Sequence, residues 1–308
     1  MIATLDDLVA RGLVAENVVL GSLTTYKFGG PARYFAEATS EADLVELGLA
    51  LGDESIVVIG RGSNLVIADR GFDGVAVRLG SGLAQIEVGD DGQIRAGGAA
   101  SLPQLARTSA KAGRGGLEWC VGVPGSVGGA VRMNAGCHGS ETSQWLVEAS
   151  VVNLRGGDVT TRTPQELDLS YRHSNLRSDE IVTGTVFRTV ESTITDAEAE
   201  IRRITAWRKE HQPGGTLNAG SVFKNPPGDF AGRLIDSLGF KGLEVGGASV
   251  SDRHANFFVA APEASAQDVF DLVWAVRRLV GEKSGVWLQP ELVFAGEFDP
   301  CSDQEAGP

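Results

Sequence analysis

The sequence predicts an α+β fold with more than one subdomain. Short β-rich runs bounded by glycine fill the first 190 residues, and longer amphipathic helices follow from about residue 196. The turns DDG at 90–92 and RGGD at 155–158 are typical of hairpins, which indicates antiparallel or mixed sheets. A chain of 308 residues also exceeds what one small core holds.

The β-rich half contains five expected strands or hairpins, each a run of branched apolar residues that ends in glycine or a turn. They are SIVVIGRG at 55–62, GVAVRLG at 74–80, QIEVGDDGQIRAGG at 85–98, VEASVVNLRGGDVTT at 147–161 and EIVTGTVFRTV at 180–190.

Five helices are expected, and four of them begin at a residue whose side chain can cap a helix N-terminus. The caps are Thr4, Ser40, Ser101 and Ser265, before the patterns at 4–13, 40–52, 101–113 and 265–285. The fifth helix, at 197–210, places Ile201, Ile204 and Trp207 on one face. The polar stretch ESTITDAE at 191–198 marks the expected domain boundary.

Composition and charge exclude several classes of protein. Lys and Arg number 27 against 40 Asp and Glu, a net charge of −13, which excludes nonspecific binding to nucleic acid or anionic membranes. Cys120, Cys137 and Cys301 are too few and too far apart for a zinc or redox motif, and we expect no metal site. Asp6 and Asp7 interrupt any signal peptide, and no apolar run reaches about 18 residues, so we expect a cytoplasmic protein without a membrane partner.

A first glycine-rich segment, VVIGRGSNLV at 57–66, runs from an apolar strand into a loop with Gly60 and Gly62. Bare glycines let successive N–H groups point into one concavity, which suits a pyrophosphate. The segment differs from the dinucleotide-binding fingerprint because Leu65 stands where the third glycine is required. A tight turn is the alternative interpretation.

A second glycine-rich segment, GLEWCVGVPGSVGGAVRMNAGCHGSE, spans residues 116–141. Four glycines surround Pro124 and Ser126, and Asn134 and Gly136 follow. A turn-rich loop needs fewer glycines than this. The segment therefore favours a large flat ligand or its phosphates over turns alone.

Eight sequence blocks occur in order over about residues 20–296. They are TTYKFGGPARYF at 24–35, GRGSNLV at 60–66, GLEWCVGVPGSVGGAVRMNAG at 116–136, YRHS at 171–174, NAGSVFKNP at 218–226, GDFAGRLIDSLGFKG at 228–242, VSDRHANFFV at 250–259 and QPEL at 289–292. Together they resemble the bacterial UDP-N-acetylenolpyruvoylglucosamine reductase (MurB) family.

The resemblance implies a two-subdomain FAD-binding fold of the vanillyl-alcohol-oxidase (PCMH) type, followed by a C-terminal α+β substrate-binding domain. We expect a helical lead-in over 1–22, the FAD-binding domain over 23–192 with a division near 82, the substrate domain over 193–298 and a frayed tail over 299–308.

The resemblance also assigns both glycine-rich segments to FAD. The implied cofactor-binding residues are Gly60, Arg61, Gly62, Ser63, Asn64, Gly122, Val123, Pro124, Gly125, Ser126, Gly129, Asn134, Ala135 and Gly136. The first loop has no histidine for covalent attachment, and buried thiols such as Cys120 and Cys137 are commoner than covalent links. We therefore expect noncovalent FAD.

The implied activity is the NADPH-dependent reduction of UDP-N-acetylglucosamine enolpyruvate to UDP-N-acetylmuramate, for peptidoglycan precursor synthesis. Arg172 would hold the negative charge that develops on the substrate carboxylate, and Glu291 would be the acid that assists Arg172 in stabilising the intermediate. Ser221 would protonate the neighbouring carbon. Tyr171, Lys224 and Asn225 would contact the sugar nucleotide. Without the resemblance, Arg172 fits a strand-edge arginine paired with a nearby carboxylate. Glu291 then fits an outward-facing carboxylate, and Ser221 fits a turn serine.

The chain departs from the family pattern at three places. Arg172 and Ser221 are only 49 positions apart, so the chain resembles the shorter class without a tyrosine-bearing insertion. His211 stands where lysine is frequent, and Cys137 and His138 stand where alanine and tyrosine are usual.

Two alternatives stay open: a flavin oxidase of the same fold, and a catalytically inactive flavin-binding paralogue. We expect a monomer whose ligands are the UDP-sugar and NADPH.

Overall fold

The structure is a computed structural model that describes residues 4–304. The chain divides into two compact units, each made of three separate stretches of sequence. The first unit comprises Met1–Asn17, Tyr34–Arg61 and Gly74–Arg208, and the second comprises Val18–Arg33, Gly62–Asp73 and Lys209–Pro308. These units differ from the predicted domains in two ways: two short N-terminal stretches fold with the C-terminal part, and residues 193–208, predicted for the substrate domain, fold with the first unit. The predicted boundaries of the cofactor and substrate domains stay predictions.

Four helices begin where the sequence predicts, because their capping side chains are engaged, whereas α6 begins at Ile194, three residues before the predicted start. Thr4, Ser40, Ser101 and Ser265 each accept a hydrogen bond from the backbone N–H three residues later. The helices are α1 (Leu5–Ala10), α2 (Glu41–Ala50), α3 (Leu102–Lys111), α4 (Val127–Arg132), α5 (Thr142–Trp145), α6 (Ile194–His211), α7 (Ala231–Ser237) and α8 (Ala266–Ser284). In α6, Ile204 is buried as expected, whereas Trp207 is 38% exposed.

A four-stranded sheet lies near the N-terminus, in the order β1 (Val14–Val19), β2 (Pro31–Ala38), β5 (Phe72–Leu79) and β3 (Ile56–Ile59). The pair β3–β5 is parallel. In the first unit, Leu8 of α1 and Leu44 and Leu47 of α2 share a core with Val75 and Val77 of β5.

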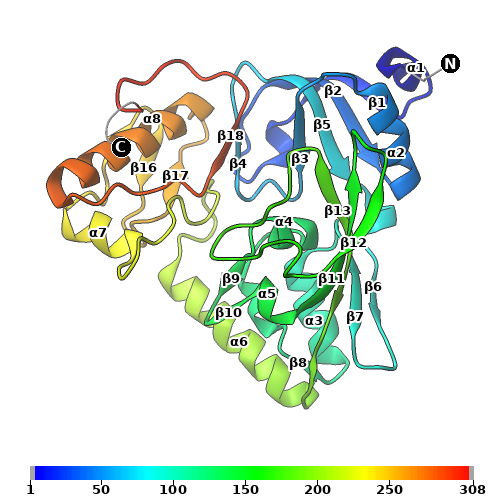
Figure 1. Ribbon diagram of the computed structural model, residues 1–308. Helices are drawn as coiled ribbons and strands as arrows, with labels where there is room; N and C mark the ends of the chain where they lie inside the picture. Colours follow the sequence, from blue (N-terminus) through cyan, green and yellow to red (C-terminus); the bar gives the residue numbers. More distant parts are fainter. Residues whose placement is uncertain (1–3, 305–308) are drawn as a thin grey trace. The chain divides into compact units, whose positions relative to one another are not determined.

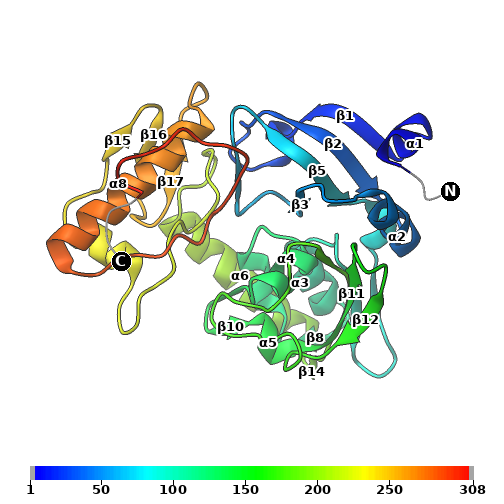
Figure 2. The same cartoon turned by 45° about the horizontal axis from the view of Figure 1, so that its top comes forward.

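A five-stranded antiparallel sheet follows in the first unit (Figure 1), in the order β12 (Val159–Arg162), β11 (Leu146–Asn153), β13 (Glu180–Phe187), β7 (Ile94–Gly97) and β6 (Ile86–Val88). Both predicted hairpins are confirmed, because β6 pairs with β7 and β11 with β12, antiparallel in each case. Helices α3 and α4 lie on one face of this sheet in Figures 1 and 2. That face is apolar and carries the second core of the unit.

Short elements connect these sheets. Two small antiparallel pairs are β8 (Arg114–Gly115) with β14 (Val190–Glu191), and β9 (Gly136–Cys137) with β10 (Ser140–Glu141). The described part of the chain also contains three short 3₁₀ helices, η1 (Gly21–Leu23), η2 (Ser81–Leu83) and η3 (Glu118–Gly122).

In the second unit, α8 packs on a three-stranded antiparallel sheet of β15 (Glu244–Val245), β16 (Ala248–Val250) and β17 (Phe258–Ala260). Val269, Leu272, Val273, Val276 and Val280 of this helix are fully buried and form part of the core of the unit. A parallel pair joins β4 (Leu65–Ile67) to β18 (Val293–Ala295), which is why residues 62–73 belong to this unit.

Residues 305–308 of the expected frayed tail lie outside the described residues. Upstream of them, Asp299 pairs with Arg70 and Asp303 with Arg278, at 2.7 Å each. Across residues 4–304, no helix is both long and apolar enough to cross a membrane.

Candidate functional site

The first glycine-rich loop, residues 60–64, is a row of unused backbone donors. It leaves β3 and leads into β4, and the chain passes from the first unit to the second between Arg61 and Gly62. None of its five backbone N–H groups donates a hydrogen bond to any residue within 4–304. Such a run of free donors suits the oxygen atoms of an anion.

The two glycines of this loop, Gly60 and Gly62, lack room for a side chain for different reasons. A Cβ on Gly60 would stand 2.5 Å from the Ser126 hydroxyl oxygen, so Gly60 itself lies directly against Ser126 of the second glycine-rich segment. Gly62 has φ +62, and a Cβ there would stand 2.1 Å from the Leu23 carbonyl oxygen. Close packing therefore requires Gly62, and its N–H remains available.

In the second glycine-rich segment, neighbouring protein atoms account for several glycines. A Cβ on Gly122 would stand 2.6 Å from Cys137 Sγ, and one on Gly136 would stand 2.5 Å from the Ser140 carbonyl oxygen. A Cβ on Gly129 would meet Ser126 Oγ at 3.2 Å. These glycines thus have a packing reason that is independent of a ligand, and the predicted cofactor contacts of residues 122–136 stay predictions.

Asn134 connects this segment to the loop that carries the predicted arginine. The residue is fully buried in the left-handed region at φ +38. Its side-chain amide donates to the Ser170 carbonyl at 3.0 Å and accepts from the Ser143 N–H at 2.9 Å. The amide of Asn134 therefore fixes the start of the YRHS motif.

Arg172 is held against the same segment. Its guanidinium donates to the Gly136 carbonyl at 2.8 Å and to the Asn134 carbonyl at 3.5 Å, and its Cζ lies 5.2 Å from the Tyr171 ring centre. Arg172 itself has φ +53, a costly conformation for a residue with a side chain. Strained backbone that the surroundings enforce is typical of functional sites.

The thiols near these loops are poor nucleophiles. Burial raises the pKa of Cys137 to about 11, against the opposing effect of Arg208 and Arg172, and its Sγ donates to the Trp119 carbonyl at 3.2 Å. Burial likewise raises the pKa of Cys120. His138 packs edge-on against Trp207, with ring centres 5.0 Å apart.

In the second unit, Ser221 and Glu291 lie on neighbouring extended segments. The Glu291 N–H donates to the Val222 carbonyl at 2.7 Å, and the Lys224 N–H donates to the Gln289 carbonyl at 2.9 Å. Two predicted motifs, NAGSVFKNP and QPEL, are thereby brought together. Ser221 is exposed, and its hydroxyl has no hydrogen-bond partner within residues 4–304.

Sequence reasoning missed Asn256, which clamps the segment that carries Ser221. Its buried amide accepts from the Phe223 N–H at 2.9 Å and donates to the Phe223 carbonyl at 2.8 Å, and its backbone carbonyl accepts from the Val222 N–H at 2.9 Å. The signal was present, because a polar side chain within the apolar run HANFFV indicates a specific buried partner.

The predicted substrate contacts are more dispersed. Asn225 accepts a hydrogen bond from the Ala231 N–H at 3.1 Å, at the start of α7. Tyr171 is 50% exposed in the first unit. Arg172 and Tyr171 thus belong to one unit, and Ser221, Lys224, Asn225 and Glu291 belong to the other.

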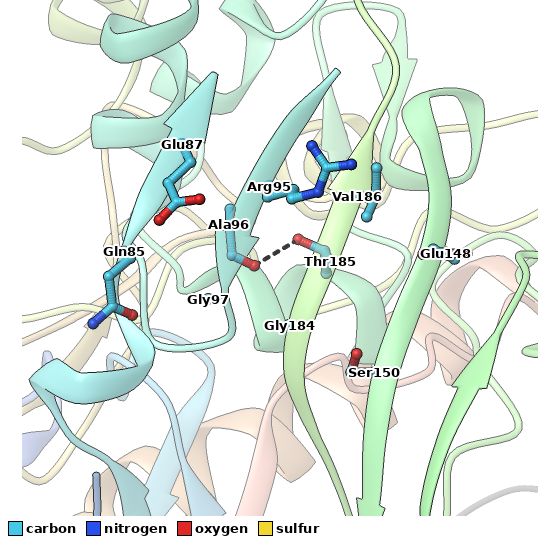
Figure 3. A pocket seen from close by; sticks show the side chains of 10 residues that line it. All are labelled: Gln85, Glu87, Arg95, Ala96, Gly97, Glu148, Ser150, Gly184, Thr185 and Val186. Atoms are coloured by element: carbon cyan, nitrogen blue, oxygen red, sulfur yellow. Dashed lines mark hydrogen bonds between the residues drawn. The ribbon is translucent and has the colours of Figure 1, made fainter. Parts of the chain in front are cut away.

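A separate hollow of about 290 Å³ lies on the five-stranded sheet, on the face opposite its apolar core (Figure 3). Three of its lining residues, Gly97, Ser150 and Gly184, have no side chain or a small one. Arg95, its cation, lies 3.8 Å from Asp91 in the β6–β7 turn. None of its lining residues was predicted as a site residue.

Two models of known protein families match separate parts of the chain. A family model described as "FAD binding domain" matches residues 32–162, and one described as "UDP-N-acetylenolpyruvoylglucosamine reductase, C-terminal domain" matches residues 212–295. The predicted fold class, a FAD-binding fold followed by an α+β substrate-binding domain, is confirmed by these matches and by the structural likeness below.

Curated relatives match over nearly the whole chain. UDP-N-acetylenolpyruvoylglucosamine reductase of Methylorubrum extorquens is 44% identical over 288 residues, 93% of each chain. The enzyme of the same name from Sphingopyxis alaskensis is 39% identical over 97% of this chain and all of its own. The crystal structure of UDP-N-acetylenolpyruvylglucosamine reductase (MurB) from Thermus caldophilus superposes with a TM-score of 0.80 at 34% identity, covering 91% of this chain and 98% of that one. The chain therefore belongs to the UDP-N-acetylenolpyruvoylglucosamine reductase family.

Proposed function

We propose that the protein is an FAD-containing, NADPH-dependent reductase that converts UDP-N-acetylglucosamine enolpyruvate to UDP-N-acetylmuramate. The observation that carries the proposal is the hydrogen-bonded pairing of residues 221–224 with residues 289–291, which supports a shared role for Ser221 and Glu291. Family membership supports the substrate class and the cofactor.

The residues present fit FAD. Loop 60–64 offers five N–H groups without an acceptor among the described residues, which matches the oxygens of a pyrophosphate. Bound FAD would supply the relay of hydride from NADPH to the enolpyruvyl carbon. The raised pKa of Cys137, caused mainly by burial, and the buried position of Cys120 support noncovalent binding.

Arg172 has the chemistry for the substrate carboxylate. A hydride added to the vinyl ether pushes negative charge into that carboxylate, and a guanidinium can receive it with two parallel hydrogen bonds. The bonds from Arg172 to two backbone carbonyls orient the side chain before substrate arrives. Preorganised charge of this kind stabilises a transition state more than a mobile one does.

Ser221 and Glu291 would complete the reaction. The Ser221 hydroxyl keeps its proton free of any bond to the described protein, so it can donate to a basic carbon within hydrogen-bond reach. Glu291 would assist Arg172 in stabilising the intermediate. Its backbone is fixed at the N–H by Val222, which limits where its side chain can extend.

A steady-state assay tests the proposal. Purified protein should be yellow, release its flavin on acid precipitation, and oxidise NADPH only when the enolpyruvyl sugar nucleotide is present. Hydrogen peroxide formed in place of reduced sugar nucleotide would support the flavin oxidase instead. Flavin without any turnover would support the inactive paralogue.

A further inference from the structure

Asn64 has a hydrogen-bonding pattern that differs from that of an ordinary strand residue. It stands immediately before β4, which pairs in parallel with β18 in a register that places Leu65 beside Val293. The Asn64 carbonyl accepts from the Val293 N–H at 3.0 Å, as the next bond of this ladder. Asn64 therefore continues the parallel pairing on its acceptor side.

On the donor side, the side chain replaces the backbone. In a parallel ladder, a residue whose carbonyl accepts from Val293 donates its own N–H to the carbonyl two residues earlier, which belongs to Glu291. Here the side-chain amide of Asn64 makes that bond, at 2.9 Å. The backbone N–H of Asn64 consequently has no acceptor within residues 4–304.

This substitution fixes Glu291 from a second side. The Glu291 N–H is already bound to the Val222 carbonyl at 2.7 Å, and its carbonyl is bound to Asn64. Both polar groups that flank the Glu291 α-carbon are thus held, one by the segment that carries Ser221 and the other by the loop with free donors. Two segments separated by 227 positions in the sequence are joined through one side chain.

We propose that Asn64 is a positioning residue with two linked effects. Its amide fixes the backbone of Glu291, and by taking the ladder bond it leaves the Asn64 backbone N–H for an anionic oxygen. Asparagine suits this role because its side-chain amide is short and donates a hydrogen bond like a peptide N–H, so it can replace the backbone donor of the same residue. The catalytic consequence rests on the function proposed above, whereas the structural one does not.

The test uses Asn64→Ala and Asn64→Leu in the full chain. Alanine removes the donor, and leucine removes it while keeping similar volume. Asn153→Ala is the matched control, because the Asn153 side chain accepts a bond from the Gly156 N–H in the β11–β12 turn and has no part in either segment. Hydrogen–deuterium exchange of residues 289–295 and FAD binding to the apoprotein are measured first.

We expect exchange across residues 289–295 to rise about tenfold or more in both Asn64 variants, because a hydrogen bond to the Glu291 carbonyl is lost. The dissociation constant for FAD should rise by a similar factor, since the freed ladder position recruits the Asn64 backbone N–H. At saturating FAD, flavin reduction by NADPH should stay within about twofold of wild type, while reoxidation by the sugar nucleotide slows about tenfold or more. The control should match wild type in all four measurements.

Unchanged exchange and unchanged FAD binding in both variants would overturn the inference, whatever the kinetics. An equal fall in both half-reactions would overturn the positioning role, since a general loss of structure explains it. If wild-type protein itself is not reoxidised by the sugar nucleotide, the proposed function is wrong, and the exchange and binding results still decide the role of Asn64.

Discussion

The two units hold their predicted site residues in different ways. In the first unit, Arg172 rests on the carbonyls of a loop that contains left-handed residues and tightly packed glycines. In the second unit, Ser221 and Glu291 lie on extended segments joined by backbone hydrogen bonds. The first arrangement depends on the absence of side-chain atoms, and the second on main-chain pairing that most side chains tolerate. Substitution of a site residue in the second unit should therefore change the rate of the reaction without changing stability, whereas in the first unit it should change both.

The largest effect is expected for Ser221→Ala. Reoxidation of the reduced enzyme by the sugar nucleotide should slow by about 10²–10⁴-fold, the usual contribution of a general acid. Flavin reduction by NADPH and the free energy of unfolding should hardly change, because the side chain is exposed and has no bond within the described protein. Rapid-mixing absorbance measurements of each half-reaction check this.

Ser237→Ala is the matched control for that variant, because within residues 4–304 the Ser237 hydroxyl bonds only to the Leu234 carbonyl, at the end of α7. It should leave both half-reactions unchanged. If reoxidation by the sugar nucleotide slows less than about tenfold in Ser221→Ala, Ser221 is an ordinary turn residue. The proton donor would then not be this residue of the second unit.

Arg172→Lys should have the next largest effect, and it should lower both the catalytic efficiency and the thermal stability. Lysine keeps the charge but cannot hold a carboxylate with two parallel bonds, so kcat/KM for the sugar nucleotide should fall by about 10–100-fold. The bonds to Gly136 and Asn134 would also be disturbed, and thermal stability should fall slightly. Steady-state kinetics and a melting curve on the same sample measure the two losses. A kinetic loss without any change in melting would weaken the contrast between the units.

Local sequence signals predicted much of the fold. The four helix caps and the two hairpins are short-range features, and all are confirmed. The parallel pair β4–β18 was not predicted, because its strands are three residues long and lie more than 220 positions apart. Pairing of that range has no local signature in the sequence.

The candidate site was predicted from motifs, and the structure adds the reasons behind individual residues. A glycine in the sequence does not tell whether a ligand or the protein itself requires the space, and Gly122 and Gly136 meet protein atoms whereas loop 60–64 keeps its donors free. Asn64 was predicted to contact the cofactor, but the bond from its side chain to Glu291 depends on tertiary pairing. The roles of the individual site residues stay predictions.

Gly136→Ala should destabilise the fold in the first unit. The added Cβ would stand 2.5 Å from the Ser140 carbonyl oxygen and 2.8 Å from Glu141 Cα, and backbone atoms cannot move without cost. Overpacking of this kind costs about 1–3 kcal/mol, which chemical denaturation followed by tryptophan fluorescence can measure. Gly214→Ala is the control, since no atom lies within 4 Å of its added Cβ. Equal stability of the two variants would contradict the packing argument.

The smallest effect concerns acid stability and Glu180, which is only 3% exposed in β13. Burial alone would raise the pKa of this carboxyl, but hydrogen bonds from the Arg162 guanidinium and the Arg177 N–H outweigh it, so the pKa is lowered from its usual value near 4.5. A carboxyl with a lowered pKa in the folded state stabilises the fold fully above its unfolded pKa, and this contribution is lost as the pH falls through the folded value.

Glu180→Gln should therefore cost about 1 kcal/mol of unfolding free energy at pH 7, a typical loss when a buried hydrogen bond to a charged group is weakened. The difference from wild type should shrink as the pH falls from 7 through the usual glutamate pKa near 4.5. Urea unfolding at several pH values in this range measures both quantities. Glu87→Gln is the control, because Glu87 is exposed on β6 and its neutralisation should shift stability by less than about 0.5 kcal/mol at every pH. If the difference in unfolding free energy between Glu180→Gln and wild type stays constant or grows on acidification, Glu180 stabilises the first unit through its shape and not through its charge. The ion pair with Arg162 would then not contribute to the stability of this unit.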